Sequence, residues 1–271
     1  MNNRIIPRLS LPLLALVSQG AVAAGHTDLS VGYEKTSGDY GQVNDTDITT
    51  IPFVAQYTED NWRFRLTIPF LSVTGDGSIL PSNNGTVKSI DNTLPGTGGG
   101  GLPLPATGSI ETNSGFGDII TSVSHALLPK HSDMFYELTA SIRWGTASTR
   151  DKLGTGQSDL SVKLYAMYER YDLRPFASVG YLIVGDTKAV DYKDALFASA
   201  GLAYRFSPMT SVSIAYEYQQ ATSDAFEDGR MLSIYANQKF SREWAGNVYV
   251  LNGLSNSVAD SGVGFTVIYS Y

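Results

Sequence analysis

Hydrophobic and polar residues alternate one by one along much of the chain, the periodicity of a β-strand whose two faces meet different surroundings. The pattern is clearest in residues 261–271, where every second side chain is large and apolar or aromatic. This face holds Val263, Phe265, Val267, Tyr269 and Tyr271. The stretch has the length of a strand that crosses a bilayer at a tilt, about 9–11 residues. Taken alone, it also fits the edge strand of a soluble sheet.

Twelve segments show this alternation, an even number. They are residues 28–36, 47–58, 62–74, 117–128, 134–145, 158–170, 174–185, 192–206, 209–220, 230–240, 242–251 and 261–271. Pro52 and Pro69 each remove a ladder donor from mid-segment, which predicts local irregularity there.

The connections between these segments alternate strictly in length. Short ones lie near 59–61, 129–133, 171–173, 207–208 and 241–242. Longer ones lie near 37–45, 75–114, 146–157, 186–191, 222–229 and 253–260. Short periplasmic turns and longer external loops are typical of outer-membrane barrels, whereas a soluble sandwich gives no reason for the alternation. We therefore predict an all-β fold: a transmembrane, antiparallel, up-and-down β-barrel of about 12 strands.

Aromatic residues gather at the predicted strand ends, as in the interfacial girdles of membrane barrels. The short-turn ends carry Tyr57, Trp62, Tyr136, Tyr168, Tyr204, Phe206, Phe240, Trp244, Tyr269 and Tyr271. The long-loop ends carry Phe70, Trp144 and Tyr218. Aromatic residues of a soluble core would not segregate in this way.

The N-terminus has the features of a secretory signal peptide. Arg4 and Arg8 give a basic start, residues 9–17 are apolar, and small residues near Ala23 and Ala24 suit cleavage. We predict that residues 1–24 are removed and that residues 25–271 form the barrel, with 75–114 as a long Gly- and Pro-rich external loop. The remaining chain holds 17 basic and 26 acidic residues, a net charge of −9. An acidic chain without basic clusters argues against nucleic-acid binding.

The polar faces of the segments define the predicted lumen, because lipid cannot satisfy charged side chains. The pore-lining candidates are Glu34, Arg63, Arg65, Asp118, Glu137, Arg143, Lys163, Glu169, Arg205, Glu217, Lys239 and Glu243. Six are acidic and six basic, which argues against strong ion selectivity. Two interpretations stay open: a polar pathway for a solute, or an internal ion-pair network that holds a closed barrel in shape.

Barrel size adds a further expectation. Eight strands are filled by side chains and sixteen leave an open channel, so twelve predict a narrow, gated or loop-constricted lumen. Residues 75–114 are the candidate constriction, with a surface loop as the alternative.

Catalysis and metal binding find little support. Ser124 and His125 are adjacent on one strand and therefore face opposite sides, so they cannot form a Ser–His pair. The chain has no Cys and three scattered His, which makes a transition-metal site unexpected. We predict no enzyme activity, no cofactor and no metal.

Four motifs resemble a known family. They are S-G-F-G-D at 114–118, L-G-T-G-Q-S-D at 153–159, P-F-A-S-V-G-Y at 175–181 and W-R-F-R-L-T-I-P-F at 62–70. Across most of residues 28–271 the chain resembles the outer-membrane β-barrels described as meta-pathway phenol degradation proteins, which are often labelled transporters. The resemblance implies an outer-membrane protein that passes small organic molecules, aromatic ones among them. The long 75–114 loop departs from that pattern.

The resulting expectation is a channel or transporter in the bacterial outer membrane for small organic molecules, aromatic or hydrophobic. The alternatives are a structural or surface-display barrel with a plugged lumen and, less favoured, an outer-membrane enzyme. The expected partners are outer-membrane lipid and the barrel-assembly machinery. The last strand resembles the signal that this machinery reads, with Phe265, Tyr269 and Tyr271 as the signal residues.

Overall fold

The computed structural model describes residues 25–77, 79–81, 87–89, 109–129, 132–186, 192–224 and 226–271, and within them the regular elements are strands. They are β1(His26–Gly38), β2(Thr46–Glu59), β3(Trp62–Gly75), β4(Ile79–Pro81), β5(Val87–Ser89), β6(Glu111–Phe116), β7(Ile120–Leu127), β8(Met134–Arg143), β9(Asp159–Tyr168), β10(Leu173–Ile183), β11(Ala195–Arg205), β12(Thr210–Gln219), β13(Gly229–Lys239), β14(Trp244–Gly253) and β15(Ser261–Ser270). In these ranges no helix is long and apolar enough to cross a membrane. The predicted signal peptide lies outside them.

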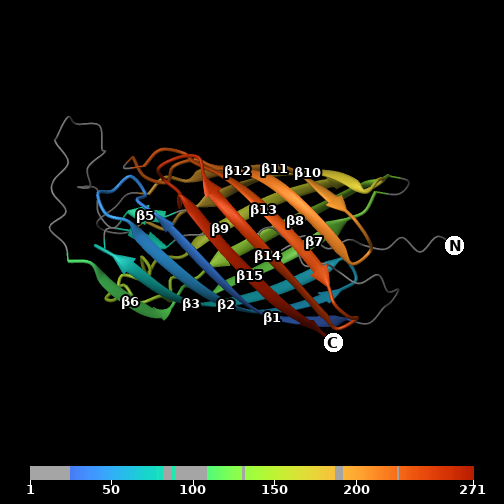
Figure 1. The fold of residues 1–271 in the computed structure, drawn as a ribbon, viewed down its shortest axis with the longest axis horizontal. Coiled ribbons are helices and arrows are strands. Elements are labelled where there is room, and N and C mark those ends of the chain that lie inside the picture. The colour runs from blue at the N-terminus through green and yellow to red at the C-terminus, as the bar shows by residue number, and fades with distance from the viewer. Residues whose placement is uncertain are drawn as a thin grey trace.

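The strands close into an antiparallel barrel of 12 strands, as predicted (Figure 1). Each long strand pairs with its neighbours in sequence, and β1 pairs with β15 to complete the ring. The closing ladder runs from Asp28↔Ser270 to Ser37↔Ser261. At its end Thr27 and Tyr271 exchange backbone hydrogen bonds of 3.1 and 3.0 Å. No barrel strand therefore keeps a free edge along this seam, which is what a bilayer requires.

The two faces of the wall differ as the alternation predicts. Side chains on the outward face are apolar and exposed, for example Val31 (44%), Leu164 (42%) and Ile234 (43%). Side chains on the inward face include buried polar groups, among them Gln56, Arg63, Glu137, Ser233 and Asn237. This is the reverse of a soluble protein and fits a wall with lipid outside.

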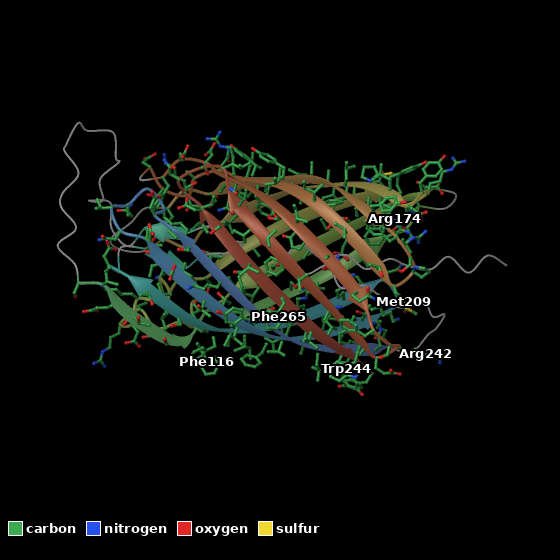
Figure 2. All side chains as sticks on the ribbon, in the orientation of Figure 1. Phe116, Arg174, Met209, Arg242, Trp244 and Phe265 are labelled. Carbon is green, nitrogen blue, oxygen red and sulfur yellow. The ribbon has the colours of Figure 1, made fainter. Side chains whose placement is uncertain are left out.

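Aromatic side chains gather at the short-turn end of the barrel. Trp244 and Tyr269 lie 5.0 Å apart between ring centroids, and Tyr204 and Phe206 lie 4.7 Å apart. Figure 2 shows Met209, Arg242 and Trp244 at this same end. The exposed aromatics there match the predicted periplasmic girdle.

The two prolines lie opposite each other in β2 and β3, at the register pair Pro52↔Pro69. Glu59↔Trp62 closes a two-residue turn and is therefore a hydrogen-bonded pair. Hydrogen-bonded and non-hydrogen-bonded pairs alternate along the ladder, which makes Pro52↔Pro69 a non-hydrogen-bonded pair. The nitrogens of both prolines therefore face the strands on the outer sides of β2 and β3. The irregularities appear on those outer sides. The β1–β2 ladder skips Pro52, and the partner of β3 changes from β7 to β6 beyond Thr67.

The predicted fourth segment, 117–128, differs most from the structure. The barrel strand β7 begins only at Ile120, and β6 occupies Glu111–Phe116, of which the first four residues belong to the predicted 75–114 loop. Residues 117–119 separate the two, and the Gly117 amide donates to the Pro69 carbonyl at 2.8 Å. Within the described ranges β6 pairs with β3 alone, at the end opposite to the C-terminus (Figure 1). The predicted loop also contains the β4–β5 pair.

The lipid-facing wall makes a direct prediction. Ile234 lies outward in the middle of β13, opposite Ile214 and Val250, whereas Phe240 follows the strand at the short-turn end. Ile234→Arg is expected to lower the free energy of unfolding by about 2–4 kcal/mol, and Phe240→Arg by about 0–1 kcal/mol. Urea unfolding in lipid vesicles, followed by tryptophan fluorescence, measures both. Equal costs at the two positions would contradict a membrane-spanning wall.

Candidate functional site

The barrel interior is the candidate site, and most of the predicted lumen residues project into it from the strands. Those on the inward face of strands are Glu34, Arg63, Arg65, Glu137, Arg143, Lys163, Arg205, Glu217 and Lys239. Asp118 lies between β6 and β7, and Glu169 directly follows β9. Glu243 is exposed in the turn before β14, because the strand begins only at Trp244. Whether these residues line a conducting pore stays a prediction.

Arg63 and Glu137 form a two-point ion pair across the interior. Arg63 Nη1 donates to Glu137 Oε1 at 3.4 Å, and Nη2 lies 3.1 Å from Oε2. Both side chains are buried, Glu137 to 2% exposure. A fork-to-carboxylate contact of this kind is the arrangement that offsets the desolvation of both charges. The pair ties β3 to β8 inside the barrel.

Arg65 extends the same network toward the barrel seam. Its Nε and Nη2 donate to Gln56 Oε1 at 3.1 and 2.7 Å, and Gln56 Nε2 donates to Asp28 Oδ2 at 3.1 Å. Asp28 Oδ1 accepts from the Ser270 hydroxyl at 2.6 Å. Neither Gln56 nor Asp28 is among the predicted pore-lining residues. Their phase in the alternation, inward on β2 and β1, was the available signal.

Two carboxylates on the opposite side of the ring are bound by tyrosines. The Tyr249 hydroxyl donates to Glu34 Oε2, and the Tyr235 hydroxyl donates to Glu217 Oε1 at 3.3 Å. Glu217 Oε1 also accepts from the Ser233 hydroxyl at 3.1 Å. The two tyrosine rings are 5.4 Å apart. These hydroxyl donors offset part of the cost of withdrawing each carboxylate from bulk water.

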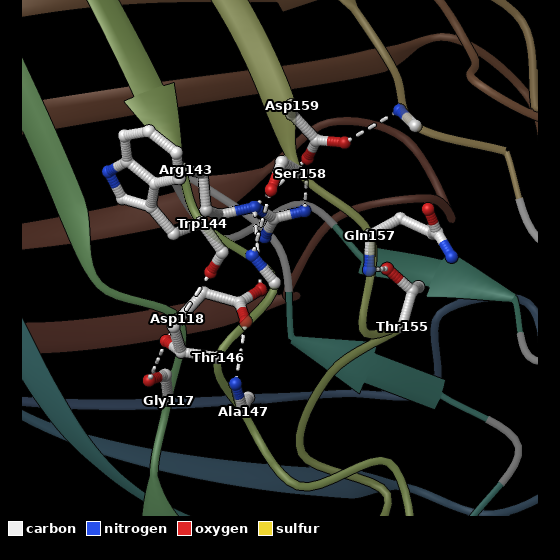
Figure 3. Close-up of polar contacts among 12 residues, drawn as sticks. Gly117, Asp118, Arg143, Trp144, Thr146, Ala147, Thr155, Gln157, Ser158 and Asp159 are labelled. Atoms are coloured by element: carbon white, nitrogen blue, oxygen red, sulfur yellow. Dashed lines mark hydrogen bonds and ion pairs between the residues drawn. The ribbon is translucent and has the colours of Figure 1, made fainter.

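A second buried ion-pair cluster lies at the long-loop end (Figure 3). Arg143 Nε donates to Asp159 Oδ2 at 3.0 Å and lies 3.7 Å from Asp118 Oδ2. Asp118 Oδ1 accepts from the Ala147 amide at 2.9 Å, and Asp159 Oδ1 accepts from the Gly185 amide at 3.0 Å. The cluster thus fixes the segment after β8 beside the junction of β6 and β7.

Apolar side chains fill other parts of the interior. Phe135, Tyr165 and Phe176 form an aromatic group from β8, β9 and β10, with ring centroids 6.3 and 6.0 Å apart. At the long-loop end Tyr40 and Ile79 are fully buried in the same continuous core cluster. Ile79 belongs to the predicted 75–114 loop, so this part of it packs inward. The rest of that loop, at 82–86 and 90–108, lies outside the described residues.

The short-turn mouth carries two further ion pairs. Arg174 Nη1 lies 3.5 Å from Glu169 Oε1, and Arg205 Nη2 lies 2.9 Å from Asp172 Oδ1. Burial raises the pKa of Glu169 to about 7, although Arg174 and Arg205 act in the opposite direction. This carboxyl therefore titrates close to physiological pH.

The arrangement of side chains suits the binding and orientation of a solute better than catalysis. Ser124 turns inward and shares a 2.9 Å hydrogen bond with Thr139, while His125 packs outside against Trp62, 4.4 Å between ring centroids. The two therefore do not form a catalytic pair, as their adjacency on one strand predicted. In the described part of the chain no group of three or more His, Asp or Glu is placed to hold a metal ion.

The Arg63–Glu137 pair can be tested by replacing one or both members. Arg63→Met is expected to lower the free energy of unfolding by about 3–5 kcal/mol, because Glu137 is then buried without a counter-charge. Adding Glu137→Met should restore most of that loss, because neither charge of the pair is then left without its partner. The three variants and the parent form a double-mutant cycle in urea unfolding. Additive losses would contradict a coupled pair.

Glu169 predicts a pH-dependent stability. Its pKa in the folded protein exceeds the ordinary value, so the folded state binds more protons than the unfolded state between the two. The stabilisation is complete below the unfolded pKa and is lost as the pH rises through about 7. The unfolding free energy of the parent should therefore fall between about pH 5 and about pH 8 relative to Glu169→Gln. A constant difference across that range would refute the assignment.

Solved structures with the same architecture are outer-membrane proteins. The crystal structure of the COG4313 outer membrane channel from Pseudomonas putida F1 matches with a TM-score of 0.66 at 12% identity, over 94% of this chain and 100% of that one. The NanC porin matches with a TM-score of 0.50 at 9% identity, over 90% of this chain and 98% of that one. Likeness at such low identity shows the fold.

Sequence comparison adds no family. No family model matches the chain, and no curated protein matches it. The resemblance to the meta-pathway phenol degradation proteins therefore rests on the four motifs alone and stays a prediction. What the comparisons show is that this chain has the β-barrel fold found in outer-membrane channels.

Proposed function

We propose that the chain is a channel of the bacterial outer membrane for small organic molecules. The observation that carries the proposal is a charged interior inside an apolar wall. Midway through the barrel, Glu34, Arg65, Lys163 and Glu217 project inward and are only half-buried. These charged groups keep accessible surface although the wall around them is closed. The space that they line is therefore open to water or to a solute.

The pathway is narrow and selects by shape and contact more than by net charge. Arg63, Glu137, Arg143 and Asp159 are buried in ion pairs, which reduces the open cross-section. Acidic and basic groups nearly balance in the interior, so neither ion sign is strongly favoured. The aromatic group of Phe135, Tyr165 and Phe176 is buried and narrows the lumen further, so the expectation of an aromatic solute rests on the family resemblance.

Assembly in the outer membrane requires the partner predicted from the last strand. Phe265, Tyr269 and Tyr271 project outward from β15 and its end, where they are exposed. We propose that these side chains are read by the barrel-assembly machinery before the strand pairs with β1.

A structural or surface-display barrel with a plugged lumen is the second candidate. It is favoured by the depth of the ion pairs and by Ile79, which is 1% exposed at the long-loop end. A fully occluded interior would conduct nothing and would leave the external loops as the functional surface.

Conductance decides between these functions. The mature chain, refolded into a planar bilayer, is compared with a variant lacking residues 90–108, which leaves β5 and β6 whole. A channel constricted by the long loop gives steady or gated current in the parent and a larger current in the deletion variant. Liposome swelling with neutral organic solutes then ranks the substrates. Absence of current and swelling in both proteins would contradict the channel and support the plugged barrel.

A further inference from the structure

Lys163 differs from the other charged side chains of the mid-barrel. It lies on the inward face of β9, opposite Thr139 of β8 and Gly180 of β10, and it is half-buried. Arg63 pairs with Glu137, and Arg65 with Gln56. Among the residues that the structure describes, no hydrogen bond or ion pair is formed by the Lys163 ammonium. It therefore presents donors to the lumen that these residues do not use.

The carboxylates within electrostatic reach of Lys163 already accept other donors. The charged groups that act on Lys163 are Glu137, Arg65, Arg63 and Glu217. Both oxygens of Glu137 are engaged by Arg63, and Glu217 Oε1 accepts from Ser233 and Tyr235. Neither carboxylate closes on the ammonium, so its charge is balanced only at a distance.

The charges are also distributed unequally around the ring. Arg63, Arg65 and Lys163 come from β3 and β9, where Glu137 of β8 offsets one of the three positive charges. Glu34 and Glu217 come from β1 and β12. The ring order β1, β2, β3, β7, β8, β9, β10, β11, β12, β13, β14, β15 places these two groups on opposite arcs. An anionic group is therefore attracted to the β3–β9 arc and repelled by the other.

Aromatic side chains lie along β9 from Lys163 and across β10 from it. Tyr165, two residues along the same face of β9, contacts Phe176 with centroids 6.0 Å apart. At the level of Lys163 itself, Gly180 of β10 lies opposite the lysine and Phe197 of β11 lies opposite Gly180. The Phe197 ring covers Gly180, where a Cβ would lie 2.2 Å from it. The glycine thus makes room for an aromatic ring beside the lysine. A cation beside a partly buried aromatic ring suits a ligand with a charged end and an apolar body.

We propose that Lys163 forms a binding site for a small organic carboxylate, with the carboxylate on the Lys163 ammonium and the apolar body against Phe197, the aromatic ring nearby that is only partly buried. The inference rests on the proposed function, since the ligand must enter the lumen. The charge-assisted hydrogen bond gives orientation and most of the discrimination against neutral solutes. Burial of the apolar part distinguishes such an acid from acetate.

Binding of benzoate to the refolded barrel tests the site, measured by calorimetry and by transient block of single-channel current. Benzamide is the uncharged isostere, and acetate lacks the apolar body. Lys163→Met should weaken benzoate binding by about tenfold or more and leave benzamide binding unchanged. Lys163→Arg should retain the binding. Lys239→Met, which removes another inward lysine at the short-turn end of β13, is the matched control and should bind benzoate as the parent does.

The outcomes separate this site from the proposed function. The site is overturned if the parent does not bind benzoate, if it binds benzamide as tightly as benzoate, or if Lys163→Met binds benzoate as the parent does. Each of these results leaves the channel standing where neutral solutes still pass. Lysine-dependent benzoate binding in a barrel that never conducts supports the site and overturns the channel. Heat-dependent mobility on gels confirms that each variant is folded, and Lys163→Arg keeps the test decisive if Lys163→Met does not fold.

Discussion

Closure of the backbone ladder is the constraint on which the rest of the structure depends. A bilayer offers no partner to a peptide N–H or C=O, so each wall strand must pair on both sides within the sheet. The β1–β15 ladder meets this demand at the seam. Pro52 and Pro69 meet it differently. Because they lie opposite each other in a non-hydrogen-bonded pair, their nitrogens face the strands on the other side of β2 and of β3. The hydrogen bonds between β2 and β3 therefore stay intact.

Closure also determines what the interior must do. Polar side chains on the inward face of the wall lie in an enclosed space, where each needs a hydrogen-bonding partner or water. Arg63 with Glu137, Arg143 with Asp159, and the tyrosines with Glu34 and Glu217 satisfy one another there. These pairs narrow the lumen and stiffen it. Lys163 is left with only distant counter-charges, and for this reason we propose it as the point at which a solute binds.

The strands, their faces and the alternation of loop lengths follow from local sequence, because period-2 patterning depends only on which face meets lipid. The partners of the interior side chains do not follow from local sequence. Arg63 and Glu137 are 74 residues apart, and only the register of β3, β7 and β8 brings them together. Strand β6 contains Asn113, Ser114 and Gly115, which have weak β-propensity, and its first four residues fall in the predicted 75–114 loop. Pairing with β3 overrides that preference. Glu243 has the inward phase but precedes the strand, so alternation alone misplaced it.

A disulfide across the seam tests closure most directly, since the natural chain has no Cys. Ser30 and Ile268 lie opposite each other on the inward side of the β1–β15 ladder. Thr27 and Tyr271 form a hydrogen-bonded pair, and because the two kinds of pair alternate, Ser30↔Ile268 is a non-hydrogen-bonded pair. Such a pair accepts a disulfide well. The Ser30→Cys/Ile268→Cys variant, taken from the outer-membrane fraction and oxidised, should cross-link almost completely within one chain. The Thr36→Cys/Ile268→Cys variant, whose positions lie far apart on the same ladder, should not. Cross-linking in the second variant, or none in the first, would contradict a closed barrel in this register.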